Sequence, residues 1–173
     1  SAQFVSPAAM YRGMVHGVQP FTLRGWLWYQ GESNRGDGMF YTKCKKALIE
    51  SWRKLWGDDM AFLFVQLAPY RYDNNDTLLP EIWEAQTASL AIPNTGMAVT
   101  TDIATIGDIH PPNKQDVGKR LSLWALANTY GKKDLVYSGP LYESLVVEGG
   151  KIRIKFKHVG GGLVSRDSKD LTW

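Results

Sequence analysis

Residues 24–38 read RGWLWYQGESNRGDG, an aromatic run followed at once by a polar stretch rich in glycine. The run 24–30 predicts a buried strand, because aromatic side chains pack well on a pleated surface, and the stretch 31–38 predicts a loop. Apolar side chains then recur every three or four residues up to Gly57, which predicts an amphipathic helix that this glycine ends. The expected apolar stripe of the helix is Tyr41, Cys44, Leu48, Trp52 and Leu55. The lysines that we expect in solvent are Lys43, Lys45 and Lys46.

The same order of strand, loop and helix occurs twice more. The expected strands are 61–67 (AFLFVQL) and 97–102 (MAVTTD), the loops after them 68–77 and 103–112, and the helices 80–90 and 113–130. Near-continuous apolar strands between amphipathic helices indicate a parallel α/β sheet covered on both faces. Right-handed crossovers then place the three loops at one edge of the sheet, where open parallel sheets bind ligands.

The pattern changes after about residue 135. The segment 144–147, a glycine pair and the alternating run KIRIKFK at 151–157 predict a β-hairpin, which belongs to an antiparallel unit. A hairpin of two strands is not stable alone. We therefore expect a main domain over 1–135 and the truncated start of a β-rich domain over 136–173.

The composition excludes several classes of protein. An apolar fraction of 44% and a charged fraction of 21% exclude a disordered chain. A net charge of +3 is too weak to indicate a nucleic-acid partner or an anionic membrane. There is no run of 18 apolar residues, and the single cysteine excludes an internal disulfide. Ligand spacing suggests no metal or organic cofactor, and we expect neither.

The third loop contains His110 in the sequence GDIHP. Asp108, two residues before it, can orient an imidazole and stabilise its cation, as a general base requires. The alternative is an exposed loop histidine without a function. We expect His16 and His158 to have structural or surface roles.

The first loop brings amide, carboxylate and hydroxyl groups to the end of a buried strand. Side-chain amides and backbone N–H groups there can form an oxyanion hole. The alternative is a polar loop that caps the next helix, for which Ser33, Asn34 or Asp37 would serve. Ser33 is similar to the serine of a Gly-x-Ser-x-Gly elbow, but Arg35 stands where the elbow needs glycine, so we do not expect Ser33 to be a nucleophile.

Two long blocks resemble a known family: GWLWYQGESN at 25–34 and DIHPPNKQDVGKRLSLWALA at 108–127. With FLFVQLAPY at 62–70 and the stretch 81–103 between them, they look like the sialate O-acetylesterases, carbohydrate esterases of the SGNH-hydrolase type. The resemblance covers nearly the whole chain. It implies a three-layer α/β/α fold and serine esterase chemistry. A serine attacks an acetyl ester on a sugar, a histidine takes its proton, and an oxyanion hole holds the tetrahedral intermediate.

The resemblance also implies roles for residues of the third loop. His110 falls on the Asp-Ile-His-Pro position of the family, which makes it the general base and Asp108 its carboxylate partner. Many relatives in the wider superfamily place the aspartate three residues before the histidine, where Gly107 stands here. Asp102 therefore remains a rival orienting group, and a backbone carbonyl is a further one.

In the first loop, the resemblance places Gln30 and Gly31 on the block that lines the oxyanion hole. Glu32 and Asn34 are expected to brace this loop or contact the substrate. The nucleophile of the family lies in a Gly-Gln-Ser-Asn type block that is absent here, so we expect the serine and its strand outside this chain. On this view the domain is incomplete at its N-terminus and its sheet lacks a strand. The missing N-terminal part is then a partner of this chain, and a separate chain is one form that it can take.

The expected function is removal of O-acetyl groups from sialic acid or another acetylated glycan, in a secreted, periplasmic or lysosomal protein. Acetylxylan esterase is one alternative. Another is a non-catalytic carbohydrate-binding or structural fragment that stacks sugars on Trp26, Trp28 and Tyr29.

Overall fold

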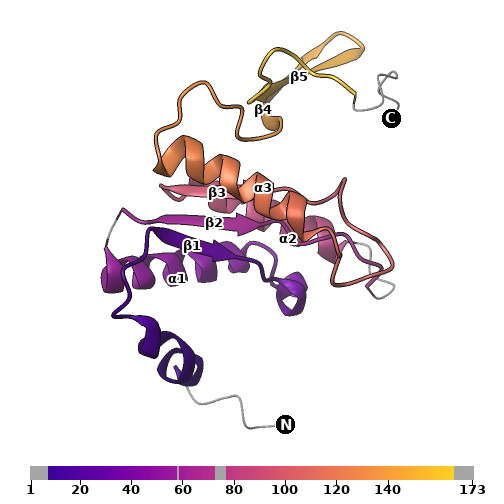
Figure 1. The fold of residues 1–173 in the computed structure, drawn as a ribbon. Helices are drawn as coiled ribbons and strands as arrows, with labels where there is room; N and C mark the ends of the chain where they lie inside the picture. Colours follow the sequence, from indigo (N-terminus) through magenta and orange to yellow (C-terminus); the bar gives the residue numbers. More distant parts are fainter. Residues whose placement is uncertain (1–7, 58, 73–76, 166–173) are drawn as a thin grey trace.

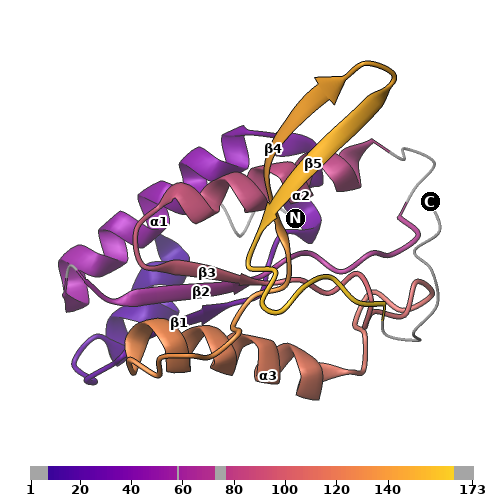
Figure 2. The same ribbon diagram turned by 90° about the horizontal axis from the view of Figure 1, so that it is seen from above.

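A computed structural model describes residues 8–57, 59–72 and 77–165 of the 173-residue chain. Its main unit consists of β1 (Gly25–Trp28), α1 (Phe40–Trp56), β2 (Ala61–Val65), α2 (Leu78–Ala88), β3 (Thr95–Ala98) and α3 (Lys114–Trp124). The three strands form a parallel sheet in the order β1-β2-β3 (Figure 1). Figure 2 shows α1 and α2 on one face of this sheet and α3 on the other. The expected three-layer α/β/α arrangement is therefore confirmed for the described residues.

Each face of the sheet has its own apolar core, because successive side chains of a strand point to opposite faces. Phe62 and Phe64 of β2 pack with Ile49 of α1. Leu63 and Val65 of the same strand pack with α3 on the other face. The residues that α3 contributes recur at three or four residues and form one apolar stripe, Val117, Leu121 and Trp124.

The buried face of α1 differs from the predicted one. Its buried residues recur at intervals of four, as Tyr41, Lys45, Ile49 and Arg53. Cys44 is exposed and Leu55 is 37% exposed, so the predicted stripe is wrong at both positions. The expectation that Lys45 lies in solvent is also wrong, because the long aliphatic stem of a lysine can enter a core. Arg53 compensates for its burial by donating to backbone carbonyls, among them that of Met60 at 3.0 Å.

Two glycines bear on the bounds of elements: one ends α1, and the other lies inside β3. Gly57 ends α1 as predicted: its φ is 142° and its N–H donates to the Arg53 carbonyl at 2.7 Å. Gly96 lies inside β3, where a Cβ atom would come within 2.5 Å of the Trp124 ring. The strand begins at Thr95, two residues before the predicted start, because this close contact with Trp124 requires a glycine that strand propensity disfavours.

The helix α2 begins two residues before the predicted start at Pro80. Proline is tolerated within a first turn because the first N–H groups of a helix have no intrahelical partner. Ile82 and Gln86, four residues apart on this helix, are fully buried. The short helices are η2 (Tyr11–Val15), η3 (His16–Val18), η4 (Glu32–Asp37), η5 (Ser89–Ala91) and η6 (Ala125–Thr129). Over the ranges that the structure describes, no helix is long and apolar enough to cross a membrane.

A separate antiparallel hairpin follows α3. It consists of β4 (Leu141–Glu148) and β5 (Lys151–Lys157), joined by the predicted glycine pair. β4 begins three residues before the predicted start, and the register shifts between Tyr142 and Ser144. Figure 1 shows the hairpin projecting beyond α3. The boundary between the two expected domains stays a prediction.

Candidate active site

The loops that follow β1, β2 and β3 lie together at the carboxyl edge of the sheet. The first and second loops meet where the Arg35 guanidinium stacks 3.9 Å from the Tyr72 ring centroid. The second and third are joined by a hydrogen bond from the backbone N–H of Arg71 to the carbonyl of Ile106, at 3.2 Å. The start of α3 returns to the first loop, since the Lys114 ammonium lies 5.0 Å from the Tyr29 ring centroid. The predicted meeting of the three loops is thus observed.

The first loop is held by hydrogen bonds among its own predicted site residues. The Gly31 N–H donates to Glu32 Oε2 at 3.1 Å, and the Gly31 carbonyl accepts from the Asn34 N–H at 2.9 Å. Gln30 Nε2 donates to Asn34 Oδ1 at 2.5 Å. Glu32 and Asn34 therefore brace this loop. In the observed conformation, the two groups expected to line an oxyanion hole donate to loop side chains.

Helix α1 supports the first loop from inside the protein. The Tyr41 hydroxyl lies 3.1 Å from the Gln30 carbonyl and 3.3 Å from Gln30 Oε1, and donates to these oxygens. Burial raises the pKa of Tyr41, so the phenol keeps its proton near neutral pH. The next turn of the loop, η4, leaves Ser33 exposed.

Helix α2 supports the second loop. Gln86 Oε1 accepts from the Leu67 N–H at 2.8 Å, and Trp83 Nε1 donates to the Leu67 carbonyl at 2.6 Å. Both polar groups of this buried peptide position are therefore satisfied by one helix. The sequence interpretation missed Gln86 as a site residue. The signal was present, because a glutamine within an apolar helix stripe needs a polar partner.

The third loop carries His110 and Asp108, both of them exposed. Asp108 Oδ1 accepts from the backbone N–H of His110 at 2.8 Å, which fixes the turn on which the imidazole stands. An action of Asp108 on the imidazole ring itself stays a prediction. The loop ends at Asn113, whose Oδ1 caps α3 by accepting from the Asp116 N–H at 3.2 Å.

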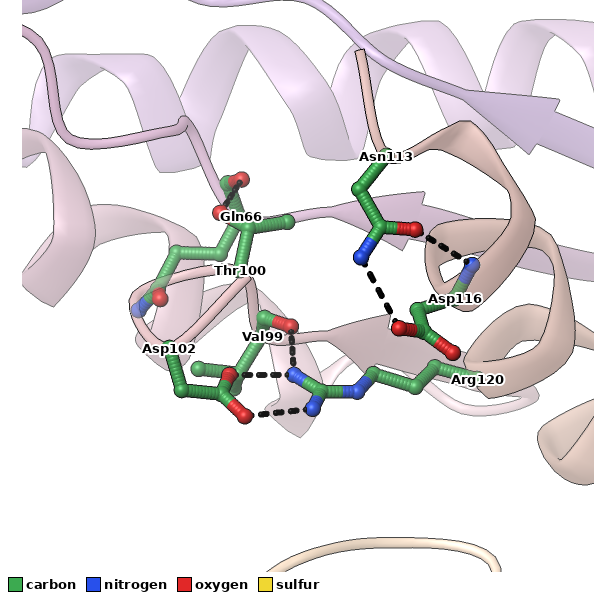
Figure 3. Close-up of polar contacts among 7 residues, drawn as sticks. All are labelled: Gln66, Val99, Thr100, Asp102, Asn113, Asp116 and Arg120. Atoms are coloured by element: carbon green, nitrogen blue, oxygen red, sulfur yellow. Dashed lines mark hydrogen bonds and ion pairs between the residues drawn. The ribbon is translucent and has the colours of Figure 1, made fainter. Parts of the chain in front are cut away.

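Asp102, the rival orienting group, lies at the start of the third loop and binds Arg120 of α3. Both its carboxylate oxygens accept from the guanidinium at 2.6 Å, and the same guanidinium donates to the Val99 carbonyl at 2.6 Å (Figure 3). The hydrogen bonds with Asp102 raise the pKa of Arg120. Asp102 thus ties the end of β3 to α3, and the loop that carries His110 is anchored at both ends.

An aromatic and cationic rim surrounds the first loop. Tyr70 and Tyr72 contact each other edge to face, with ring centroids 4.9 Å apart, and Arg35 covers the second of these rings. Burial, followed by the charge of Glu32, raises the pKa of Tyr72 to about 12. Trp26, which the non-catalytic alternative uses to stack sugars, is only 8% exposed and packs in the core instead.

A cavity of about 620 Å³ lies at the opposite edge of the sheet, where the strands begin. It is lined by residues that include Arg24, Gly57, Ala61 and Thr95. This cavity is remote from the three loops because each of these positions precedes or starts a strand. Among the described residues, no three histidine, cysteine, aspartate or glutamate side chains are grouped so that they could hold a metal ion.

A parallel sheet between helices, with a Gln-Gly loop and a histidine loop at its carboxyl edge, is the arrangement of the SGNH class of esterases. The family model for carbohydrate esterases described as sialic acid-specific acetylesterases matches residues 2–126. The chain belongs to this family.

Relatives of known name are similar over most of the chain. The sialate O-acetylesterase of Mus musculus is 40% identical over 154 residues, which cover 78% of this chain and 28% of the relative. That of Homo sapiens is 35% identical over 158 residues, covering 80% and 30%. The crystal structure of a carbohydrate acetylesterase from Xanthomonas citri is 38% identical with a TM-score of 0.81, and the match covers 86% of this chain and 35% of that one. The match thus spans less than a third of the length of the two mammalian sialate O-acetylesterases.

Proposed function

We propose that the protein to which this chain belongs hydrolyses O-acetyl esters of sialic acid or of another acetylated sugar. The observation that carries the proposal is the match to the acetylesterase family over residues 2–126, within which the first and third loops meet at one edge of the sheet. The rim of tyrosines and cations beside the first loop suits a sugar, since aromatic faces pack on sugar rings and cations attract an acidic sugar.

In this proposal, His110 is the general base of a serine esterase. The imidazole accepts the hydroxyl proton as the serine Oγ bonds to the acetyl carbon, and the carbonyl electrons move onto oxygen. The Gly31 N–H and the Gln30 amide stabilise this oxyanion once they leave the loop groups to which they now donate. Collapse releases the sugar hydroxyl, which takes the proton from the imidazole, and water then hydrolyses the acetyl-enzyme by the same steps.

We propose that the serine lies on sequence outside this chain and packs beside β1. Within the described residues β1 pairs only with β2, and Leu27 of this edge strand is 68% exposed. A strand that covered this side would bury Leu27 and bring its own carboxyl end to the edge that carries His110. The proposed location of the protein, which is secreted, periplasmic or lysosomal, rests on the family alone.

The test is acetate release from O-acetylated sialic acid by a polypeptide extended to the length of the relatives, with acetylated xylan as the competing substrate. Replacing the base, His110→Ala, is expected to lower kcat by at least about a thousandfold. His16→Ala is the matched control, because His16 is equally exposed but lies in the N-terminal helical segment. Undiminished turnover in the His110→Ala protein would show that His110 is not the base. Release from xylan alone would replace the proposed substrate.

A further inference from the structure

Gln86 is a polar side chain without solvent contact, placed between two of the site loops. It is 0% exposed, and its Oε1 accepts from the Leu67 N–H directly after β2. Its other half faces the first loop: a Cβ atom on Gly31 would lie 3.4 Å from Gln86 Nε2 and 3.8 Å from the Tyr41 hydroxyl. The backbone of Gly31, with its φ of 154°, therefore lies directly against this pair of side chains.

The Nε2 group of Gln86 has no hydrogen-bond partner among the described residues. A buried amide donor left unsatisfied costs roughly 1–3 kcal/mol. A methionine of similar length would fill the same space without an unsatisfied amide donor, but it would leave the buried Leu67 N–H without its acceptor. Burial raises the pKa of the nearby Tyr41 hydroxyl, and the Trp28 and Gln86 side chains lower it, as expected for donors close to the phenol oxygen.

Tyr41 acts on the peptide group that joins Gln30 to Gly31. Its hydroxyl donates to the Gln30 carbonyl, and the N–H of the same peptide group belongs to Gly31. A hydrogen bond accepted by a peptide carbonyl polarises the group and makes its N–H a stronger donor, because hydrogen bonds in a chain reinforce one another. A small rotation that brings Gln86 Nε2 onto the phenol oxygen would complete a chain from Gln86 through Tyr41 to this peptide.

We propose that Gln86 and Tyr41 are positioning residues that hold and polarise the Gln30–Gly31 peptide, so that the Gly31 N–H can stabilise the oxyanion. The inference rests on the proposed function, since it assigns a task to that same site. On this proposal α2 serves both loops: Gln86 fixes the second loop through Oε1, and its Nε2 lies next to the first. Glycine suits this point because a side chain would be strained at a φ of 154°.

The experiment is a double-variant comparison in the extended polypeptide, with kcat and KM measured for acetate release. Tyr41→Phe and Gln86→Met are each expected to lower kcat about tenfold and to leave KM within about twofold, because they weaken stabilisation made in the transition state. Since both residues act through one peptide, the double variant is expected to be no slower than the slower single variant. The matched controls are Tyr130→Phe and Gln115→Met, whose side chains are exposed.

The outcomes separate this inference from the function on which it rests. Acetate release by the wild type with unchanged kcat in both single variants overturns the inference alone, as do losses that multiply in the double variant. A rise in KM at constant kcat also overturns it, because it would place the residues in substrate binding. A wild type that releases no acetate overturns the proposed function, and the inference with it. Thermal unfolding of each variant identifies a loss of activity that comes from unfolding. If Gln86→Met does not fold, Tyr41→Phe still tests the proposed chain of hydrogen bonds.

Discussion

Lys45 is a buried lysine whose replacement is expected to stabilise the protein. It is 3% exposed on the inner face of α1, and its Nζ has no hydrogen-bond partner among the described residues. The ammonium lies 3.6 Å from the ring centroid of Phe64 and 4.7 Å from that of Tyr41. Burial lowers its pKa from 10.5 to about 7. The perturbation is Lys45→Met, which keeps the length of the side chain and removes the charge.

The magnitude follows from the two pKa values. A pKa of 10.5 in the unfolded chain and about 7 in the folded one corresponds to roughly 5 kcal/mol against the charged amine. Contacts between the ammonium and the two rings offset roughly 1–2 kcal/mol of this. At pH 7 we therefore expect Lys45→Met to raise the free energy of unfolding by about 3 kcal/mol.

The pH dependence gives a second, independent readout. Below about pH 7 both states of the wild type carry the charged amine, and the full penalty applies. Between about pH 7 and 10.5 the unfolded state binds more protons, so the free energy of unfolding of the wild type rises with pH. Lys45→Met lacks this contribution. The difference between the two proteins should therefore shrink steadily as the pH rises.

The assay is urea denaturation followed by tryptophan fluorescence at several pH values from 7 to 10. Lys46→Met is the matched control, because that side chain is 61% exposed and lies 3.7 Å from Glu50. The control is expected to change the free energy of unfolding by less than about 1 kcal/mol. A Lys45→Met protein that is less stable at pH 7 and keeps the wild-type pH slope would refute the reasoning, because the amine would then have a stabilising partner.

Two further predictions concern packing and the third loop. Gly96→Ala is expected to cost about 2–3 kcal/mol of unfolding free energy, because the new Cβ would come within 2.5 Å of Trp124. Gly118→Ala, with no atom within 4 Å, should instead stabilise α3 by up to about 1 kcal/mol in the same denaturation assay. Equal effects of the two would contradict the close contact. Arg120→Met is expected to cost about 1 kcal/mol, since Arg120 and Asp102 are 28% and 49% exposed, and less in 1 M salt. If Arg120→Lys matched the wild type, the bidentate geometry would be shown to contribute nothing.

The central strand could be predicted because β2 is buried on both faces. A strand in this position needs an uninterrupted apolar run, and 61–67 supplies one that little else in the chain imitates. The third strand was harder to delimit, because Gly96 carries no apolar signal. Its place in the strand comes from a contact with Trp124, which is distant in sequence.

The buried face of α1 could not be predicted from hydropathy. The pattern ranks Cys44 as apolar and Lys45 as polar, yet Cys44 lies exposed and Lys45 lies over the Phe64 ring. Arg53 enters the same face because carbonyls at the sheet edge accept hydrogen bonds from its guanidinium. A long cationic side chain enters a core when its stem finds apolar contacts, and those contacts come from elements elsewhere in the chain.

In the candidate site, too, the positions of the loops could be predicted, but the contacts of their side chains could not. Topology alone predicts that the loops with Gln30 and His110 share one edge. Spacing places Asp108 near His110 but does not tell whether the carboxylate accepts from the imidazole ring or from the backbone N–H. The observed hydrogen bond is with the backbone N–H. The sequence signals that Gln86 needs a polar partner, but its neighbours Leu67 and Gly31 lie on two loops that only the folded sheet brings together.

The exposed groups of the site owe their positions to buried or ion-paired groups on the helices. Tyr41 and Gln86 hold the first and second loops from within, and Arg120 binds the start of the third. These anchors lie on α1, α2 and α3, so each helix that covers the sheet also fixes one loop at its edge. The Gly31 N–H, by contrast, is bound only to a partly buried carboxylate of its own loop, Glu32. The first loop thus has a fixed carbonyl side and an exchangeable N–H side. This asymmetry suits the proposed oxyanion hole, whose donor must be stationary yet able to change its acceptor.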